Sequence, residues 1–226
     1  MNQEKRWEEL KDIQLRLFID TAEVEEIREA VKTGVVAGIA MNPGKIAQTG
    51  RKTEEIVSEV REFFAGPISV QGIDEKAEDI VKEAKRLAKL SHDIVIKVPV
   101  NEEGIKAIRE LVPLGVQTNA TLIFSPTQGL LAGLANSPFI SPFVGRATDV
   151  GGDGIETISQ IKTLFQQYDI STKIIAASIK NVKQVVDSII AGADMVAVPW
   201  GVLKSMFYHP LTAEGIEKFV SAWRTR

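Results

Sequence analysis

From residue 17 onward, the chain alternates short β-branched segments with longer, charged amphipathic segments. Short runs of Val and Ile are typical of buried strands, and apolar residues that recur every three or four positions are typical of helices. The pattern predicts eight strands, at residues 17–20, 35–41, 68–71, 94–98, 116–122, 139–143, 173–177 and 195–198. It predicts eight helices between and after them, at residues 23–32, 53–64, 75–90, 102–111, 127–135, 155–168, 182–191 and 201–207.

This alternation indicates an α/β fold with parallel strands joined by right-handed crossovers. Eight units favour a closed (β/α)8 TIM barrel, and 226 residues suffice for one barrel of roughly 200–250 residues. We therefore expect a single barrel domain over residues 15–226. No glycine-rich phosphate-binding loop follows any predicted strand, which disfavours a nucleotide-binding sheet.

Two terminal segments lie outside the eight units. Residues 1–14 are expected to form an N-terminal helical extension that packs on the barrel or on another subunit. Its apolar residues at helical spacing are Trp7, Leu10 and Ile13. Residues 212–223 predict a C-terminal helix of the kind that often mediates subunit contacts. Its apolar face would carry Ile216, Phe219, Val220 and Trp223.

Composition and charge exclude several classes of protein. The chain has 27 Lys and Arg against 30 Asp and Glu, a net charge of −3 with no basic block, which argues against nucleic-acid binding. It has no Cys, which excludes thiol nucleophiles, disulfides and thiolate metal sites. With only two His, it cannot build a three-histidine metal site, so no metal site is expected.

One uncharged segment, residues 111–145, exceeds the roughly 20 residues of a membrane-spanning helix. Four prolines and several amide and hydroxyl residues interrupt it, so it predicts a buried core rather than a membrane segment. Residues 1–14 are charged and lack the apolar core of a signal peptide. A cytoplasmic protein with no membrane partner is expected.

In such barrels the active site lies at the C-terminal ends of the strands. Polar residues stand at or just beyond seven of the eight predicted strand ends. They are Asp20, Asn42, Gln71, Lys97, Thr121, Ser141, Arg146, Ser178 and Lys180. A solvated rim would also show polar groups, so no residue of this set is decisive alone.

Lys97 is the most informative of them because its strand is otherwise apolar. Side chains alternate along a strand, so Lys97 shares a face with Val95, and both would point into the barrel. Burial favours a neutral amine, which is a nucleophile toward carbonyls. The structural alternative is a strand-end lysine that reaches solvent or forms an ion pair with Asp20.

Arg146, Ser178 and Lys180 follow the sixth and seventh predicted strands, near the usual phosphate site of such barrels. Ser178 could also begin a helix whose backbone N–H groups face a bound anion. The alternative is a set of rim charges with an ordinary helix cap at Ser178 or Asn181. Taken together, the group favours an anion site.

With these residues in place, the chain resembles the small-subunit branch of the transaldolase family, which includes fructose-6-phosphate aldolases. The resemblance runs from residue 15 to residue 223, and several motifs occur in order. They are FIDT at 18–21, NP at 42–43, IVIKVP at 94–99, TNATLIF at 118–124, SPFVGR at 141–146, AAS at 176–178 and HPLT at 209–212. The resemblance implies a (β/α)8 enzyme without metal or organic cofactor, often assembled as a decamer.

The resemblance also implies catalytic roles. Lys97 would form the Schiff base with a ketose carbonyl, and Asp20 would move the proton of the sugar hydroxyl. Thr121 would position the catalytic water, together with Gln71. An iminium is an electron sink, so the neighbouring carbon–carbon bond can break to leave an enamine.

Binding roles follow from the same resemblance. Asn42 and Ser141 would hold the three-carbon unit that stays on the enzyme. Arg146 and Ser178, with Lys180, would clamp the terminal anion of a ketose or aldose phosphate or sulfonate.

The chain departs from the family pattern at three places. After the second strand the usual Thr-Thr-Asn-Pro-Ser is replaced by AMNPG at residues 40–44, so three hydroxyls are lost and we expect nothing polar in their place. Gln71 replaces the Glu of transaldolases, as in the aldolase branch. Phe143, which would contact the substrate, replaces the Tyr of the aldolase branch, as in transaldolases.

Because Phe143 lacks the hydroxyl that would help protonate the enamine, we expect transfer rather than release. The expected activity is transfer of dihydroxyacetone from fructose 6-phosphate or 6-deoxy-6-sulfofructose to an aldehyde such as glyceraldehyde 3-phosphate. One alternative is an aldolase that releases free dihydroxyacetone. Another is a non-catalytic sugar-phosphate-binding barrel, which the intact Lys97 disfavours.

Overall fold

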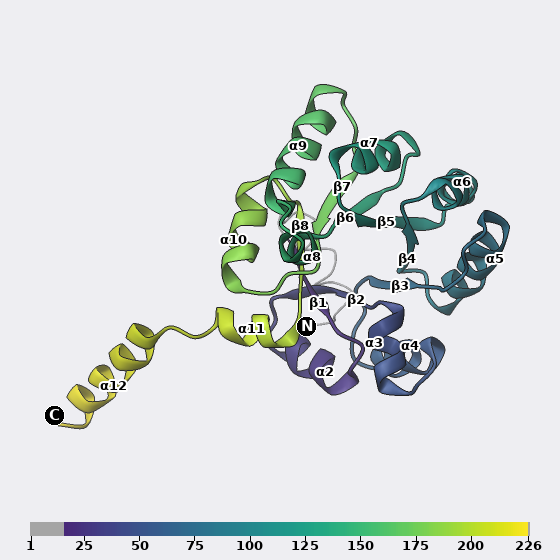
Figure 1. The fold of residues 1–226 in the computed structure, drawn as a ribbon. Helices are drawn as coiled ribbons and strands as arrows, with labels where there is room; N and C mark the ends of the chain where they lie inside the picture. Colours follow the sequence, from purple (N-terminus) through teal and green to yellow (C-terminus); the bar gives the residue numbers. More distant parts are fainter. Residues whose placement is uncertain (1–15, 226) are drawn as a thin grey trace.

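The computed structural model, which describes residues 16–225, shows parallel strands that pair in sequence order and close into a barrel (Figure 1). Closure is direct, because β1 pairs with both β2 and β8. The strands are β1 Arg16–Asp20, β2 Val36–Ala40, β3 Ile68–Gln71, β4 Ile94–Pro99, β5 Gln117–Ile123, β6 Phe139–Pro142, β7 Lys173–Ala176 and β8 Met195–Val198. The predicted fold, a (β/α)8 TIM barrel, is confirmed.

Most of the helices surround the barrel as an outer ring (Figure 1). The helices of the described residues are α2 Val24–Lys32, α3 Pro43–Thr49, α4 Thr53–Arg61, α5 Ala77–Leu87, α6 Glu102–Leu111, α7 Pro126–Leu134, α8 Val144–Asp149, α9 Gly154–Gln167, α10 Val182–Ile190, α11 Trp200–Met206 and α12 Pro210–Arg224. Two 3-10 turns, η1 Ala88–Leu90 and η2 Val112–Leu114, extend α5 and α6. Within residues 16–225, no helix is long and apolar enough to cross a membrane.

Two helices were not predicted, α3 and α8. Each is short, seven and six residues, and follows directly on a strand end. A segment of less than two turns carries too few apolar positions to show a helical period. Both therefore lay hidden in loops at the end of the barrel where the active site was expected. The predicted N-terminal extension, residues 1–14, lies outside the described residues.

Alternation along the strands separates two apolar regions. Outward residues such as Ile19 are fully buried against the helices. Inward residues form a separate cluster inside the barrel, which consists of Phe18, Ala40, Ile175, Met195 and Ala197. Gly38 is required here, because a Cβ at this position would lie 2.5 Å from the Phe18 ring. The Phe18 ring thus occupies the barrel interior and forms part of the floor of the cavity above it.

The last helix, α12, extends away from the ring of helices (Figure 1). It contains the predicted segment 212–223 and is longer by a few residues. It buries no side chain against the barrel, and Phe219 is 78% exposed. Its exposed apolar side chains include Ile216, Phe219 and Val220.

Candidate active site

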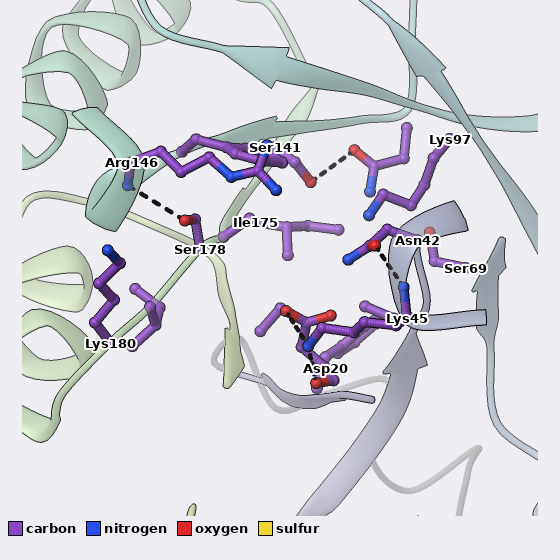
Figure 2. Close-up of a pocket in the computed structure, with 17 residues that line it drawn as sticks. Asp20, Asn42, Lys45, Ser69, Lys97, Ser141, Arg146, Ile175, Ser178 and Lys180 are labelled. Carbon is purple, nitrogen blue, oxygen red and sulfur yellow. Dashed lines mark hydrogen bonds and ion pairs between the residues drawn. The ribbon is translucent and has the colours of Figure 1, made fainter. Parts of the chain in front are cut away.

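A cavity of about 200 Å³ opens at the C-terminal ends of the strands (Figure 2). Most of the predicted site residues line it, namely Asp20, Asn42, Lys97, Ser141, Phe143, Arg146, Ser178 and Lys180. Lys97, Asn42 and Lys45 lie on one side of the cavity, and Arg146, Ser178 and Lys180 lie on the other (Figure 2). The cavity therefore has the buried Lys97 at one end and the guanidinium of Arg146 at the other.

Lys97 is buried at 7% exposure in β4, and its neighbour Val95 is also buried, as the alternation predicted. Burial lowers the pKa of the Lys97 ammonium below its ordinary value of 10.5. Asp20 raises this pKa, whereas the positive charges of Lys45 and Arg146 lower it. The net direction is downward, toward the neutral amine that attacks carbonyls.

Asp20, at the end of β1, forms its ion pair with Lys45 rather than with Lys97. The Lys45 ammonium lies 3.0 Å from Asp20 Oδ2 and also donates to the Asp20 main-chain oxygen. Asp20 Oδ1 is buried without a hydrogen-bond partner among the described residues. The structural alternative for Lys97, an ion pair with Asp20, is therefore wrong.

Asn42 caps the N-terminus of α3. Its Oδ1 accepts a hydrogen bond from the backbone N–H of Lys45 at 3.1 Å, and Pro43 occupies the first helical position. Because the cap engages Oδ1, the amide NH₂ remains as the donor of this side chain toward the cavity.

Ser141 and Asn119 form a buried pair across β5 and β6. Ser141 Oγ donates to Asn119 Oδ1 at 2.9 Å, and both residues line the cavity. In the sequence, Asn119 stands inside the motif TNATLIF, and no role for it was predicted. Its register beside Lys97 was a usable signal, because paired residues of neighbouring strands point to the same face.

Gln71 and Thr121 do not line the cavity. Gln71 pairs in register with Lys97, so both lie at the same level of the barrel. Thr121 pairs with Pro99 at the end of β4, and its Oγ1 is buried without a partner among residues 16–225. Ser69 Oγ is equally buried and unpartnered, and Ser69 does line the cavity. Such orphaned hydroxyls need a water or a ligand to complete their hydrogen bonds.

At the opposite end, Arg146 is the cation available to an anion. Its guanidinium lies 5.1 Å from the centroid of the Phe143 ring, and no carboxylate of the described chain pairs with it. Its backbone N–H donates to Ser178 Oγ at 3.3 Å. The Lys180 ammonium, by contrast, is paired with Asp149 at the surface.

Ser178 does not begin a helix, so that expectation is wrong. It has a left-handed backbone with φ of 59°, and the helix that follows, α10, is capped by Asn181. Its carbonyl accepts from the N–H of Gly145 at 2.9 Å, and a Cβ on Gly145 would lie 2.2 Å from that carbonyl oxygen. The glycine thus allows α8 to approach Ser178 and to bring Arg146 to the cavity.

The altered loop after β2 changes the cavity differently from the expectation. Ala40 lines the cavity, so one hydroxyl is lost there. Met41 is fully buried in the outer core, and Gly44 does not line the cavity. The next residue along the loop, Lys45, places an ammonium in the cavity.

Comparison with known proteins agrees with this geometry. The family model described as Transaldolase/Fructose-6-phosphate aldolase matches residues 17–225. A protein named "Probable transaldolase" from Carboxydothermus hydrogenoformans is 46% identical over 210 residues, which cover 93% of this chain and 98% of that protein. Another with this name, from Aquifex aeolicus, is 42% identical over 209 residues, which cover 92% and 96%.

Among solved structures, thiamine phosphate pyrophosphorylase from Pyrococcus furiosus shares the fold. It superposes with a TM-score of 0.55 and 18% identity, over 82% of this chain and 86% of that one. This likeness concerns the barrel alone. The family match and the relatives decide the identity: the chain belongs to the transaldolase/fructose-6-phosphate aldolase family and is a transaldolase-family enzyme.

Proposed function

We propose that this enzyme is a Schiff-base transaldolase that cleaves a ketose with a terminal anion and transfers its dihydroxyacetone unit to an aldehyde such as glyceraldehyde 3-phosphate. The observation that carries the proposal is Lys97, a buried lysine with a lowered pKa in a cavity that also holds Arg146. A carbonyl nucleophile at one end and a cation at the other match a ketose with a terminal anion.

In the proposed reaction, the neutral amine of Lys97 adds to the C2 carbonyl, and loss of water gives an iminium. Asp20 takes the proton of the C4 hydroxyl as the C3–C4 bond breaks. The bonding electrons pass into the iminium to form an enamine, and the aldehyde that carries the anion leaves. The enamine then attacks the acceptor aldehyde, and Asp20 returns the proton to the new hydroxyl. Water hydrolyses the iminium that results, which releases the product ketose and restores the free amine of Lys97.

The polar groups around Lys97 have supporting roles in this scheme. Asn42 donates through its free amide NH₂ to the three-carbon unit, and Ser141, whose proton is donated to Asn119, accepts from a hydroxyl of that unit. Thr121, whose Oγ1 has no partner among residues 16–225, positions the water lost and regained at C2, with Gln71 beside Lys97.

Arg146 and Ser178 bind the terminal anion, and Lys180 contributes charge from the rim. A guanidinium offers two parallel N–H donors to a tetrahedral oxyanion, which suits phosphate and sulfonate alike. We retain both donors, fructose 6-phosphate and 6-deoxy-6-sulfofructose, as candidates. A sulfonate carries one charge less than a phosphate dianion, so the two should differ in their dependence on Arg146.

Borohydride trapping tests the proposal. The enzyme is mixed with each donor, with and without glyceraldehyde 3-phosphate, reduced, and measured by intact mass and peptide mapping. We expect a three-carbon adduct on Lys97 that decreases when the acceptor is present, and the donor that labels faster identifies the terminal anion. If neither donor labels Lys97, the proposed activity is wrong and the non-catalytic binding barrel becomes the better account.

Phe143→Tyr tests transfer against release. Phe143 lines the cavity, and its ring packs edge-on against the ring of Phe124, with 5.6 Å between the ring centroids. A tyrosine hydroxyl would supply a proton donor for the enamine, so we expect the ratio of free dihydroxyacetone to transferred product to rise by about ten-fold. The ratio is measured by chromatography of the products, and an unchanged ratio would contradict the role given to Phe143.

We also propose that the enzyme is a homo-oligomer, a decamer as in many small-branch members. Helix α12 supports this, because it extends from the barrel and exposes an apolar face with Ile216, Phe219 and Val220. Phe219→Glu should therefore shift the sedimentation coefficient to that of a smaller species. An unchanged distribution would show that α12 does not hold the assembly together.

A further inference from the structure

Lys45 is a charged residue in the cavity to which the family pattern gives no role. It stands in the first turn of α3, and that turn is fixed by Pro43 and by the cap from Asn42. Its backbone N–H donates to Asn42, and its side-chain ammonium contacts Asp20 (Figure 2). One residue thus connects two side chains of the proposed reaction.

The Lys45 ammonium contacts Asp20 at two atoms. The ammonium pairs with Oδ2 at 3.0 Å and donates to the main-chain oxygen of the same residue. Both side chains are largely shielded, at 27% exposure for Lys45 and 15% for Asp20. An ion pair that is partly shielded and anchored at two points restricts the rotation of the carboxylate far more than an exposed pair does.

This contact makes the two oxygens of Asp20 unequal. Oδ2 is engaged by Lys45, whereas Oδ1 is buried and has no partner within residues 16–225. A carboxylate oxygen with free lone pairs can accept a proton from a substrate hydroxyl, and the engaged oxygen is poorly placed to do so.

We propose that Lys45 is a positioning residue that holds Asp20 by Oδ2, so that Oδ1 is the oxygen that takes the hydroxyl proton during carbon–carbon cleavage. This inference rests on the proposed Schiff-base function. Lys45 also has a smaller effect on the nucleophile, because its charge lowers the pKa of Lys97 in addition to the larger effect of burial.

The test separates Schiff-base formation from bond cleavage. Lys45→Met keeps the length of the side chain and removes its charge. With enzyme in excess over the donor and well above the dissociation constant, we expect release of the aldehyde fragment to slow by about 10²-fold, the cost of a misplaced catalytic group. Borohydride trapping of dihydroxyacetone on Lys97 at pH 9, which needs no cleavage, should stay within about three-fold of wild type. The KM for the donor should change little.

A double-mutant cycle shows whether Lys45 acts through Asp20. In the Asp20→Asn background, Lys45→Met should slow cleavage by less than about three-fold, because the interaction has already been removed. Lys45→Arg, which can still form the ion pair, should recover most of the rate lost in Lys45→Met. Lys162→Met is the matched control, since Lys162 is 30% exposed and pairs with Asp194, a residue outside the cavity, at 3.2 Å.

Each outcome has one meaning. If Lys45→Met cleaves within about three-fold of wild type, or slows the Asp20→Asn enzyme as much as it slows wild type, the positioning role is wrong while the proposed function stands. If wild type itself forms no adduct and cleaves neither donor, the proposed function fails. Thermal unfolding of each variant distinguishes a slow enzyme from an unfolded one, and Lys45→Arg keeps the test decisive if Lys45→Met does not fold.

Discussion

Replacing Lys97 by methionine should abolish turnover, with a loss on the order of 10⁴-fold or more, because the proposed Schiff base forms on this amine. The three-carbon adduct should vanish from the intact mass with it. The other two lysines that line the cavity, Lys45 and Lys180, are held in ion pairs with carboxylates. Measurable turnover above the uncatalysed rate, or an adduct on a different lysine, would contradict the mechanism. Lys162→Met, outside the cavity, should keep activity and serves as the control.

The same substitution should leave the folded state as stable as wild type or more so. Methionine fills a similar volume without the cost of burying an ammonium, which is the main cause of the lowered pKa of Lys97. A lysine whose pKa is lowered by folding binds its proton more tightly in the unfolded state. The resulting loss of stability in wild type is therefore greatest at pH values below the lowered pKa of Lys97. It disappears as the pH rises to the ordinary pKa of 10.5.

The stability advantage of Lys97→Met should therefore shrink as the pH rises from neutral toward 10.5. Denaturant unfolding of both proteins across this range measures it. A variant that is markedly less stable at neutral pH would show that Lys97 stabilises the fold, and its loss of activity would then say little about chemistry.

The fold was predictable because the strands are short, apolar and regularly spaced. The same alternation correctly placed Val95 and Lys97 on one inward face, because each lines a cavity together with Phe18 of the barrel interior. It also held an unused signal, because Ala40 and Met41 must point to opposite faces and only one of them can reach the cavity. Counting all three lost hydroxyls therefore overstated the change in the cavity lining, because only residue 40 lines the cavity.

The role of Lys45 was not predictable from the sequence. Whether its ammonium reaches Asp20 depends on the direction of α3, a helix too short to show a period. The left-handed backbone of Ser178 was hidden for a similar reason, because it occurs where Gly145 of another element approaches closely. Both features depend on contacts between segments far apart in the chain, which no local pattern records.

Arg146→Met should reduce kcat/KM for donors with a terminal phosphate or sulfonate by about 10²–10³-fold, because it removes two charge-assisted hydrogen bonds to the anion. For uncharged fructose the loss should be less than about three-fold, since that donor never used the guanidinium. Steady-state kinetics with both kinds of donor measure the ratio. The comparison also cancels any change in the pKa of Lys97, which Arg146 lowers for every donor alike.

Arg146→Lys sharpens this experiment. It keeps the charge and loses the planar fork, so it should recover part of the affinity, and more for a phosphate dianion than for a sulfonate. If kcat/KM falls equally for charged and uncharged donors, Arg146 acts on the reaction at Lys97 or on the stability of the fold and does not bind the anion. Because Lys180 is engaged by Asp149, it should not substitute for Arg146, and Arg146→Met should stay defective even at high donor concentration.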